Sequence, residues 1–81
     1  MLRIHDCEEA AVLYAAGLRP TACEWSGPRM YFLFPDTPHA RTALGKFAAG
    51  DLHIDPRAIL AGFREARKRL WQEKREAGDS R

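Results

Sequence analysis

Long apolar runs are missing from this 81-residue sequence. A membrane-spanning helix needs about 18 consecutive apolar residues, and no segment approaches that length. The N-terminal segment has an early Arg3, but Asp6, Glu8 and Glu9 interrupt the apolar stretch that a signal peptide requires. We therefore expect neither a membrane segment nor a signal peptide.

Cysteine is scarce as well. Zinc sites bring their ligands in close pairs such as C-x2-C and H-x3-H, and among two cysteines and three histidines only His5 and Cys7 are that close. Cys7 and Cys23, in a chain without a signal, predict reduced thiols and a cytoplasmic protein, although a disulfide between them is the alternative. We expect no metal and no cofactor.

Sequence signatures of catalysis are also absent. The chain has no G-x-S-x-G, no P-loop, no G-x-G-x-x-G and no H-E-x-x-H. Two pairs, His53 with Asp55 and Asp36 with His39, have the spacing of an acid–base dyad. However, Asp55 stands where a helix cap is expected and Asp36 stands in a turn. We therefore expect no enzyme and no catalytic residue.

The sequence is rich in helix starts and stops. Asp6 and Glu9 predict a capping box, in which the Asp6 side chain accepts from the Glu9 amide. Thr37 and Asp55 each precede a proline, which favours the first turn of a helix, and glycines follow the first two helices. The predicted helices cover residues 7–16, 38–49 and 56–77.

Between the first two helices, residues 18–25 and 30–34 predict two strands joined by a turn at residues 26–29. The order α-β-β-α-α indicates one small α+β domain over residues 1–81, in which an antiparallel two-stranded hairpin packs on helices and residues 78–81 form a short tail. An isolated hairpin is marginal in water, so its apolar side needs helical cover. The predicted core is Phe32, Phe34, Phe47, Phe63 and Leu70.

Charge is segregated toward the last helix. Residues 1–56 carry five basic and seven acidic side chains, whereas residues 57–76 carry seven basic and three acidic ones. Around the helix axis, one basic stripe opposes the core positions and has no acid in the favoured i,i+4 order. A separate flank, in which Arg69 can pair with Glu65 or Glu73 and so neutralise charge, consists of Glu65, Arg69, Glu73 and Glu76. The stripe spans roughly 27 Å, with Trp71 beside it. Its cations are Arg57, Arg64, Lys68 and Arg75.

The stripe admits two interpretations. In one it is a docking surface, with cations that attract an acidic partner and Trp71 as an anchor or a stacking platform. In the other it is an ordinary solvated helix face, and Trp71 covers the edge of the core.

A set of short motifs follows the chain in order: Asp6, Ala11 and Leu13 (D-x4-A-x-L), Gly17-Leu18, Arg29 to Asp36 (R-x-Y-F-L-F-P-D), Phe47 to Gly50 (F-x-x-G), Asp55-Pro56, and Arg64, Arg67 and Leu70 (R-x-x-R-x-x-L). This pattern resembles a family of small uncharacterised proteins found in bacterial and phage genomes, over about residues 4–72. The resemblance implies a fold and offers no catalytic or ligand residues. It also implies phage or mobile-element biology, where small basic proteins often bind nucleic acid or disable a host defence complex.

Three hypotheses follow from the sequence. The first is a non-catalytic binding module that docks on nucleic acid or a nucleoprotein complex through Arg57, Arg64, Lys68, Trp71 and Arg75. The second is a protein-binding inhibitor or accessory factor, for example of anti-defence (anti-CRISPR-like) type, that acts on a host defence protein through Trp71 and the hairpin face. The third is a homodimer that buries the second face of the hairpin or pairs a strand edge.

Overall fold

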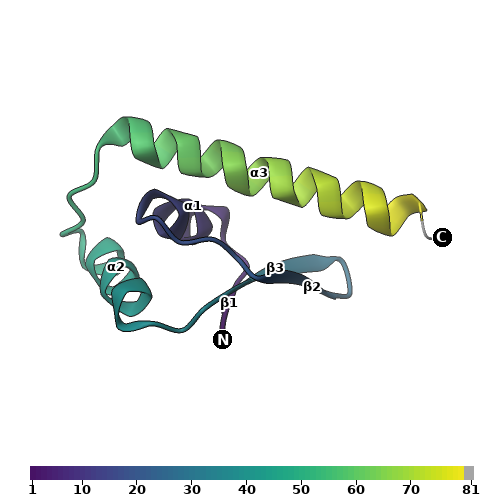
Figure 1. The fold of residues 1–81 in the computed structure, drawn as a ribbon, viewed down its shortest axis with the longest axis horizontal. Helices are drawn as coiled ribbons and strands as arrows, with labels where there is room; N and C mark the ends of the chain where they lie inside the picture. Colours follow the sequence, from purple (N-terminus) through teal and green to yellow (C-terminus); the bar gives the residue numbers. More distant parts are fainter. Residues whose placement is uncertain (80–81) are drawn as a thin grey trace.

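A three-stranded sheet and three helices make up the part of the chain that the computed structural model describes, residues 1–79 (Figure 1). The elements, in chain order, are β1 (Leu2–Ile4), α1 (Cys7–Ala15), β2 (Ala22–Ser26), β3 (Arg29–Phe34), α2 (Pro38–Ala49) and α3 (Pro56–Asp79). Two residues of the tail predicted at 78–81 belong instead to α3. The other two, 80–81, lie outside the described residues. None of the described helices is both long and apolar enough to cross a membrane.

The sheet corrects the predicted two-stranded hairpin. Its order is β1-β3-β2, with every pair antiparallel, so the N-terminal strand adds to the far side of the hairpin. Leu2 pairs with Phe34 and Ile4 with Phe32, which are about thirty positions away in the chain. A strand of three residues is too short to show an alternating pattern, so β1 can be recognised only from its pairing with β3. The element order is therefore β-α-β-β-α-α.

The core lies between the inner face of the sheet and the helices. Met30, Phe32 and Phe34 alternate along β3 and are buried, as a strand with one covered face requires. The helix α1 lies beneath the N-terminal half of α3 (Figure 1), and five consecutive residues of it, Ala10 to Tyr14, are buried. The expected burial of Phe32 and Phe34 is confirmed at 1% and 0% exposure.

The other three predicted core residues are only half-buried. Phe47 and Leu70 pack against the buried cluster from its edge. Phe63 lines an open groove of about 420 Å³ between α1, the end of α2 and the start of α3. The reason is that α3 approaches α1 through its small residues, Gly62 and Ala66, which leaves Phe63 to one side.

Local signals set most element boundaries. Thr37 caps α2 by accepting from the Ala40 amide at 3.1 Å, and Gly17 and Gly50 adopt φ of 90° and 77° after α1 and α2, as expected. The predicted capping box of α1 is wrong in detail, because the Asp6 carboxylate accepts from the Glu8 amide at 2.8 Å. The first strand of the hairpin begins at Ala22, later than predicted, because the chain after Gly17 is still bonded to the end of α1.

Candidate functional site

The placement of α3 begins at two small residues. Gly62 and Ala66 are buried one turn apart on the same side of the helix. A Cβ on Gly62 would collide with the carbonyl oxygen of Ala11, so the backbones of α1 and α3 are in direct contact there. With this side fixed against α1, the opposite side of α3 faces solvent (Figure 1).

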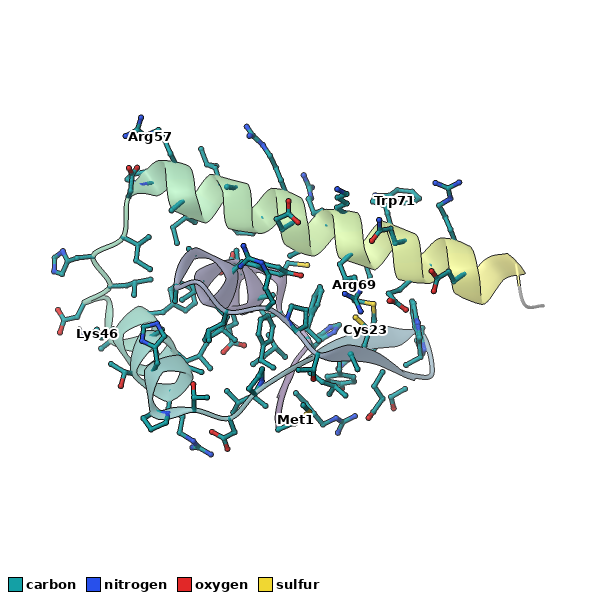
Figure 2. All side chains as sticks on the ribbon, viewed as in Figure 1. Met1, Cys23, Lys46, Arg57, Arg69 and Trp71 are labelled. Atoms are coloured by element: carbon teal, nitrogen blue, oxygen red, sulfur yellow. The ribbon has the colours of Figure 1, made fainter. Side chains whose placement is uncertain are left out.

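All five residues of the predicted site lie on that outer side and are exposed. Trp71 is 66% exposed and points away from the body of the protein, while Arg69 points from the underside of α3 toward Cys23 (Figure 2). The interpretation of Trp71 as a cover for the core edge is therefore wrong. Its indole ring is available to a partner.

Arg57, a member of the predicted stripe, is paired with an acid in the structure. Its guanidinium bonds the Asp55 carboxylate at 3.1 Å, and its amide donates to the same carboxylate at 2.9 Å. These hydrogen bonds hold the pKa of Asp55 below its ordinary value. The acid precedes the helix, so a search for i,i+4 pairs along the helix does not find it. Arg57 is partly neutralised and also stands two turns before the next cation.

Two further cations belong to the site. At about 100° per residue, six positions between residues 61 and 76 share a sector of about 120° around the helix, and none of them is acidic. Arg67 and Lys74 were missed because the predicted stripe was centred on Arg57, although the same periodicity contains them. We call this set the cationic face: Arg64, Arg67, Lys68, Trp71, Lys74 and Arg75.

Trp71 lies at the centre of the cationic face. The Lys74 ammonium is 5.8 Å from the centroid of its ring, within cation–π range. The face from Arg64 to Arg75 covers roughly 16 Å of helix axis. Among the ion pairs that the described residues form, none involves Arg64, Arg67, Lys68 or Lys74.

The acidic flank of α3 is separate and partly buried. Arg69 pairs with Glu73 at 3.0 Å, which confirms one of the predicted pairs. Arg69 faces Tyr14 and Cys23, and burial raises the pKa of both the Tyr14 hydroxyl and the Cys23 thiol. This flank therefore neutralises charge through the Arg69–Glu73 pair on the side of α3 that faces the core, and the outer side of the helix stays positively charged.

The second face of the sheet carries a neutralised cluster. Arg3 on β1 bonds Glu24 on β2 at 2.8 Å, across the strand between them. The Arg3 guanidinium also lies 4.3 Å from the centroid of the Tyr31 ring. The centroids of the His5 and Tyr31 rings are 5.5 Å apart. Because these groups satisfy one another, this face offers less unpaired charge than the outer side of α3.

Three of the four residues in the two candidate dyads are engaged elsewhere: Asp36, His39 and Asp55. Arg41 donates to Asp36 at 2.6 Å, which lowers the pKa of that carboxyl, and Arg57 holds Asp55. The Nε2–H of His39 donates to the Ala16 carbonyl at 3.0 Å. Within residues 1–79, no group of three or more His, Cys, Asp or Glu side chains is placed to hold a metal. Cys7 and Cys23 are both free and half-buried.

Comparisons of the chain with protein-family models, with curated proteins and with solved structures each find no match. The resemblance to the bacterial and phage family therefore stays a prediction.

Proposed function

We propose that this protein is a non-catalytic binding module that docks on nucleic acid, free or within a nucleoprotein complex, through the cationic face of α3. One observation carries the proposal: five cations surround an exposed tryptophan, and no acid shares their sector of the helix. The sequence resemblance, with its phage or mobile-element context, is consistent with this function but adds no residues to it.

Phosphate binding suits this arrangement because the energy comes from many weak charge contacts. Each phosphate that a cation neutralises releases counterions, so affinity falls with salt by a slope of about −0.7 to −0.9 per contact on logarithmic axes. With five cations on one face, the steepest slope expected is about −4.5 for duplex DNA and about −3.5 for a single strand. The cations are exposed and long, so they can follow a flexible backbone without rearrangement of the fold.

The test compares two charge-matched double variants. Arg64→Gln with Lys68→Gln removes two cations from the cationic face, whereas Arg41→Gln with Lys46→Gln removes one arginine and one lysine from α2. All four side chains are exposed. Substitution of Arg64, Lys68 or Lys46 is expected to change stability by less than about 0.5 kcal/mol, whereas Arg41→Gln also breaks the exposed ion pair with Asp36 and is expected to cost somewhat more. Fluorescence anisotropy with a labelled oligonucleotide, at low and at physiological salt, gives affinity and salt slope for each variant.

We expect the α3 double variant to bind more weakly, and its salt dependence to become shallower by the amount expected for two phosphate contacts. The α2 double variant is expected to keep the affinity and the salt dependence of the parent. Equal losses of affinity in the two variants would show that binding depends only on net charge, and would contradict a role for the cationic face. An absence of binding even at low salt would exclude the function.

A second function has a specific observation in its favour. Leu60 and Trp71 are large apolar side chains, 56% and 66% exposed, on the same outer side of α3. Aromatic and aliphatic anchors of this kind favour a protein partner, such as a host defence protein that the module would inhibit. This function predicts binding that depends on Trp71 and Leu60 and weakens little with salt. Binding of Trp71→Ala and Leu60→Ala variants to a candidate partner, at low and at physiological salt, measures both properties. The predicted homodimer remains a third hypothesis, tested by the oligomeric state in solution.

A further inference from the structure

A recess separates the C-terminal half of α3 from the tip of the hairpin. The residues that line it include the half-buried Trp25 and Leu70, the buried Phe32, and the exposed Arg29 and Lys74, whose exposure places them at the rim. The hairpin register contributes to this arrangement, because Trp25 pairs with Met30 and Ser26 with Arg29 at the tip of the hairpin, which lies below the C-terminal half of α3 in Figure 1. Arg29 and Lys74 are 45 positions apart in the sequence, and only the fold brings them to one opening.

The chemistry of the recess suits a flat aromatic group attached to an anion. No carboxylate lines it, whereas Glu65 lines the recess on the opposite flank of α3. Its rim residues, Arg29 and Lys74, are exposed and cationic. Its lining offers an indole ring and apolar carbon, against which a ring can stack.

The size of the recess limits its occupant. Its volume of about 210 Å³ is below the range of roughly 300–1,000 Å³ that is typical of sites for drug-sized ligands. The recess is therefore suited to one ring system and is too small to enclose a whole cofactor.

The recess is continuous with the cationic face. Lys74 belongs to both, since its ammonium lies 5.8 Å from the centroid of the Trp71 ring and its side chain lines the recess. A chain of phosphates that follows the cationic face therefore reaches the rim of the recess past Lys74. Two aromatic side chains, Trp71 outside and Trp25 inside, border that path.

We infer that the recess receives one unpaired base of a single-stranded nucleic acid, while Trp71 stacks on a neighbouring base. The inference rests on the proposed function and narrows it from nucleic acid in general to single strands. The physical reason is accessibility: a duplex hides its base faces in its own stack, whereas an unpaired base can leave the strand and stack on an aromatic ring. Phosphates on either side of the base contact Arg29 and Lys74.

The two tryptophans make the test direct, because each can be observed alone. Trp71→Phe leaves Trp25 as the only tryptophan, and this exposed substitution does not disturb the core. Trp25→Phe leaves Trp71. Intrinsic tryptophan fluorescence of each variant is recorded while a single strand, or the duplex of the same sequence, is added at low salt.

We expect the single strand to change the emission of both tryptophans and the duplex to leave Trp25 emission unchanged. We also expect Arg29→Gln to weaken single-strand binding by about 10-fold or more, the loss of one charge-assisted contact, and to leave duplex binding within about twofold. Lys46→Gln, an exposed cation on α2, is the matched control and is expected to change neither.

The outcomes separate the two proposals. Salt-sensitive binding of both nucleic acids with equal affinity and unchanged Trp25 emission would overturn the single-strand inference and keep the proposed function. A Trp25 response of the same size to duplex and to single strand would also overturn it. Failure of both nucleic acids to bind would overturn the inference together with the proposed function.

Discussion

Gly62 offers the sharpest test of how α3 is held in place. Glycine in the interior of a helix costs roughly 1 kcal/mol relative to alanine, so a glycine in the first half of a 24-residue helix requires a reason. The reason is the contact with α1. A Cβ at this position would collide with the Ala11 carbonyl oxygen and would lie 3.1 Å from its carbonyl carbon and 3.2 Å from its Cα.

The magnitude of Gly62→Ala follows from two opposing terms. All three neighbours of the new methyl group are backbone atoms of a buried helix, so no side chain can rotate away and α3 must move off α1. Overpacking of this kind costs about 1–3 kcal/mol, and we place it at the upper end because rigid backbone opposes rigid backbone. The gain in helix propensity offsets about 1 kcal/mol. The expected net loss is about 2 kcal/mol.

Gly45→Ala is the matched control. Gly45 is also a helical glycine, in α2, but it is exposed and a Cβ there would have no neighbour within 4 Å. The same substitution is therefore expected to stabilise the protein by up to about 1 kcal/mol. Urea denaturation followed by circular dichroism measures both, and the two variants should differ by about 3 kcal/mol. In a domain of this size, that corresponds to roughly 12–24 °C in Tm. Equal or greater stability of Gly62→Ala than of the parent would refute the close approach of α1 and α3.

Two further predictions concern partly buried side chains. Phe63→Ala should cost about 1–2 kcal/mol in urea denaturation, against about 3–5 kcal/mol for Phe32→Ala, because Phe63 borders an open groove and Phe32 is 1% exposed; equal losses would place Phe63 in the core after all. In a Cys7→Ser variant, alkylation of Cys23 by iodoacetamide should be slow at neutral pH and still accelerate above pH 9.0, because burial raises the pKa of this thiol and only the thiolate reacts. A rate that levels off below that pH would contradict the burial of Cys23.

Sequence reasoning was most successful where structure is decided locally. The starts and ends of α2, the left-handed glycines after α1 and α2, and the alternation of β3 all follow from residues within a few positions of one another. The outward placement of Arg64, Lys68, Trp71 and Arg75 is local in the same sense. A helix of fixed pitch presents these residues together whatever it packs against.

The errors in the sheet and the core concern partners that are distant in the chain, whereas those at Asp6 and Arg57 concern an acid two positions away. The three residues of β1 have no pattern by themselves and become a strand only because β3 offers a free edge. Phe63 has the hydrophobicity and spacing of a core residue, yet the contact of Gly62 with Ala11 rotates the centre of the buried side away from it. From sequence alone, a glycine within a helix indicates only a loss of helix propensity and not a close contact with another helix.

The sequence alone thus determined which segments are helical, which helix concentrates the positive charge, and which side of that helix is polar. Spacing of three to four residues is sufficient for these properties because the backbone geometry of a helix is fixed. The tertiary structure decided that α3 contacts α1 at Gly62, and that Arg29 and Lys74 border one recess with Trp25. Those results depend on how rigid elements pack, and packing is determined by shape at contacts such as that between Gly62 and Ala11, which no local pattern encodes.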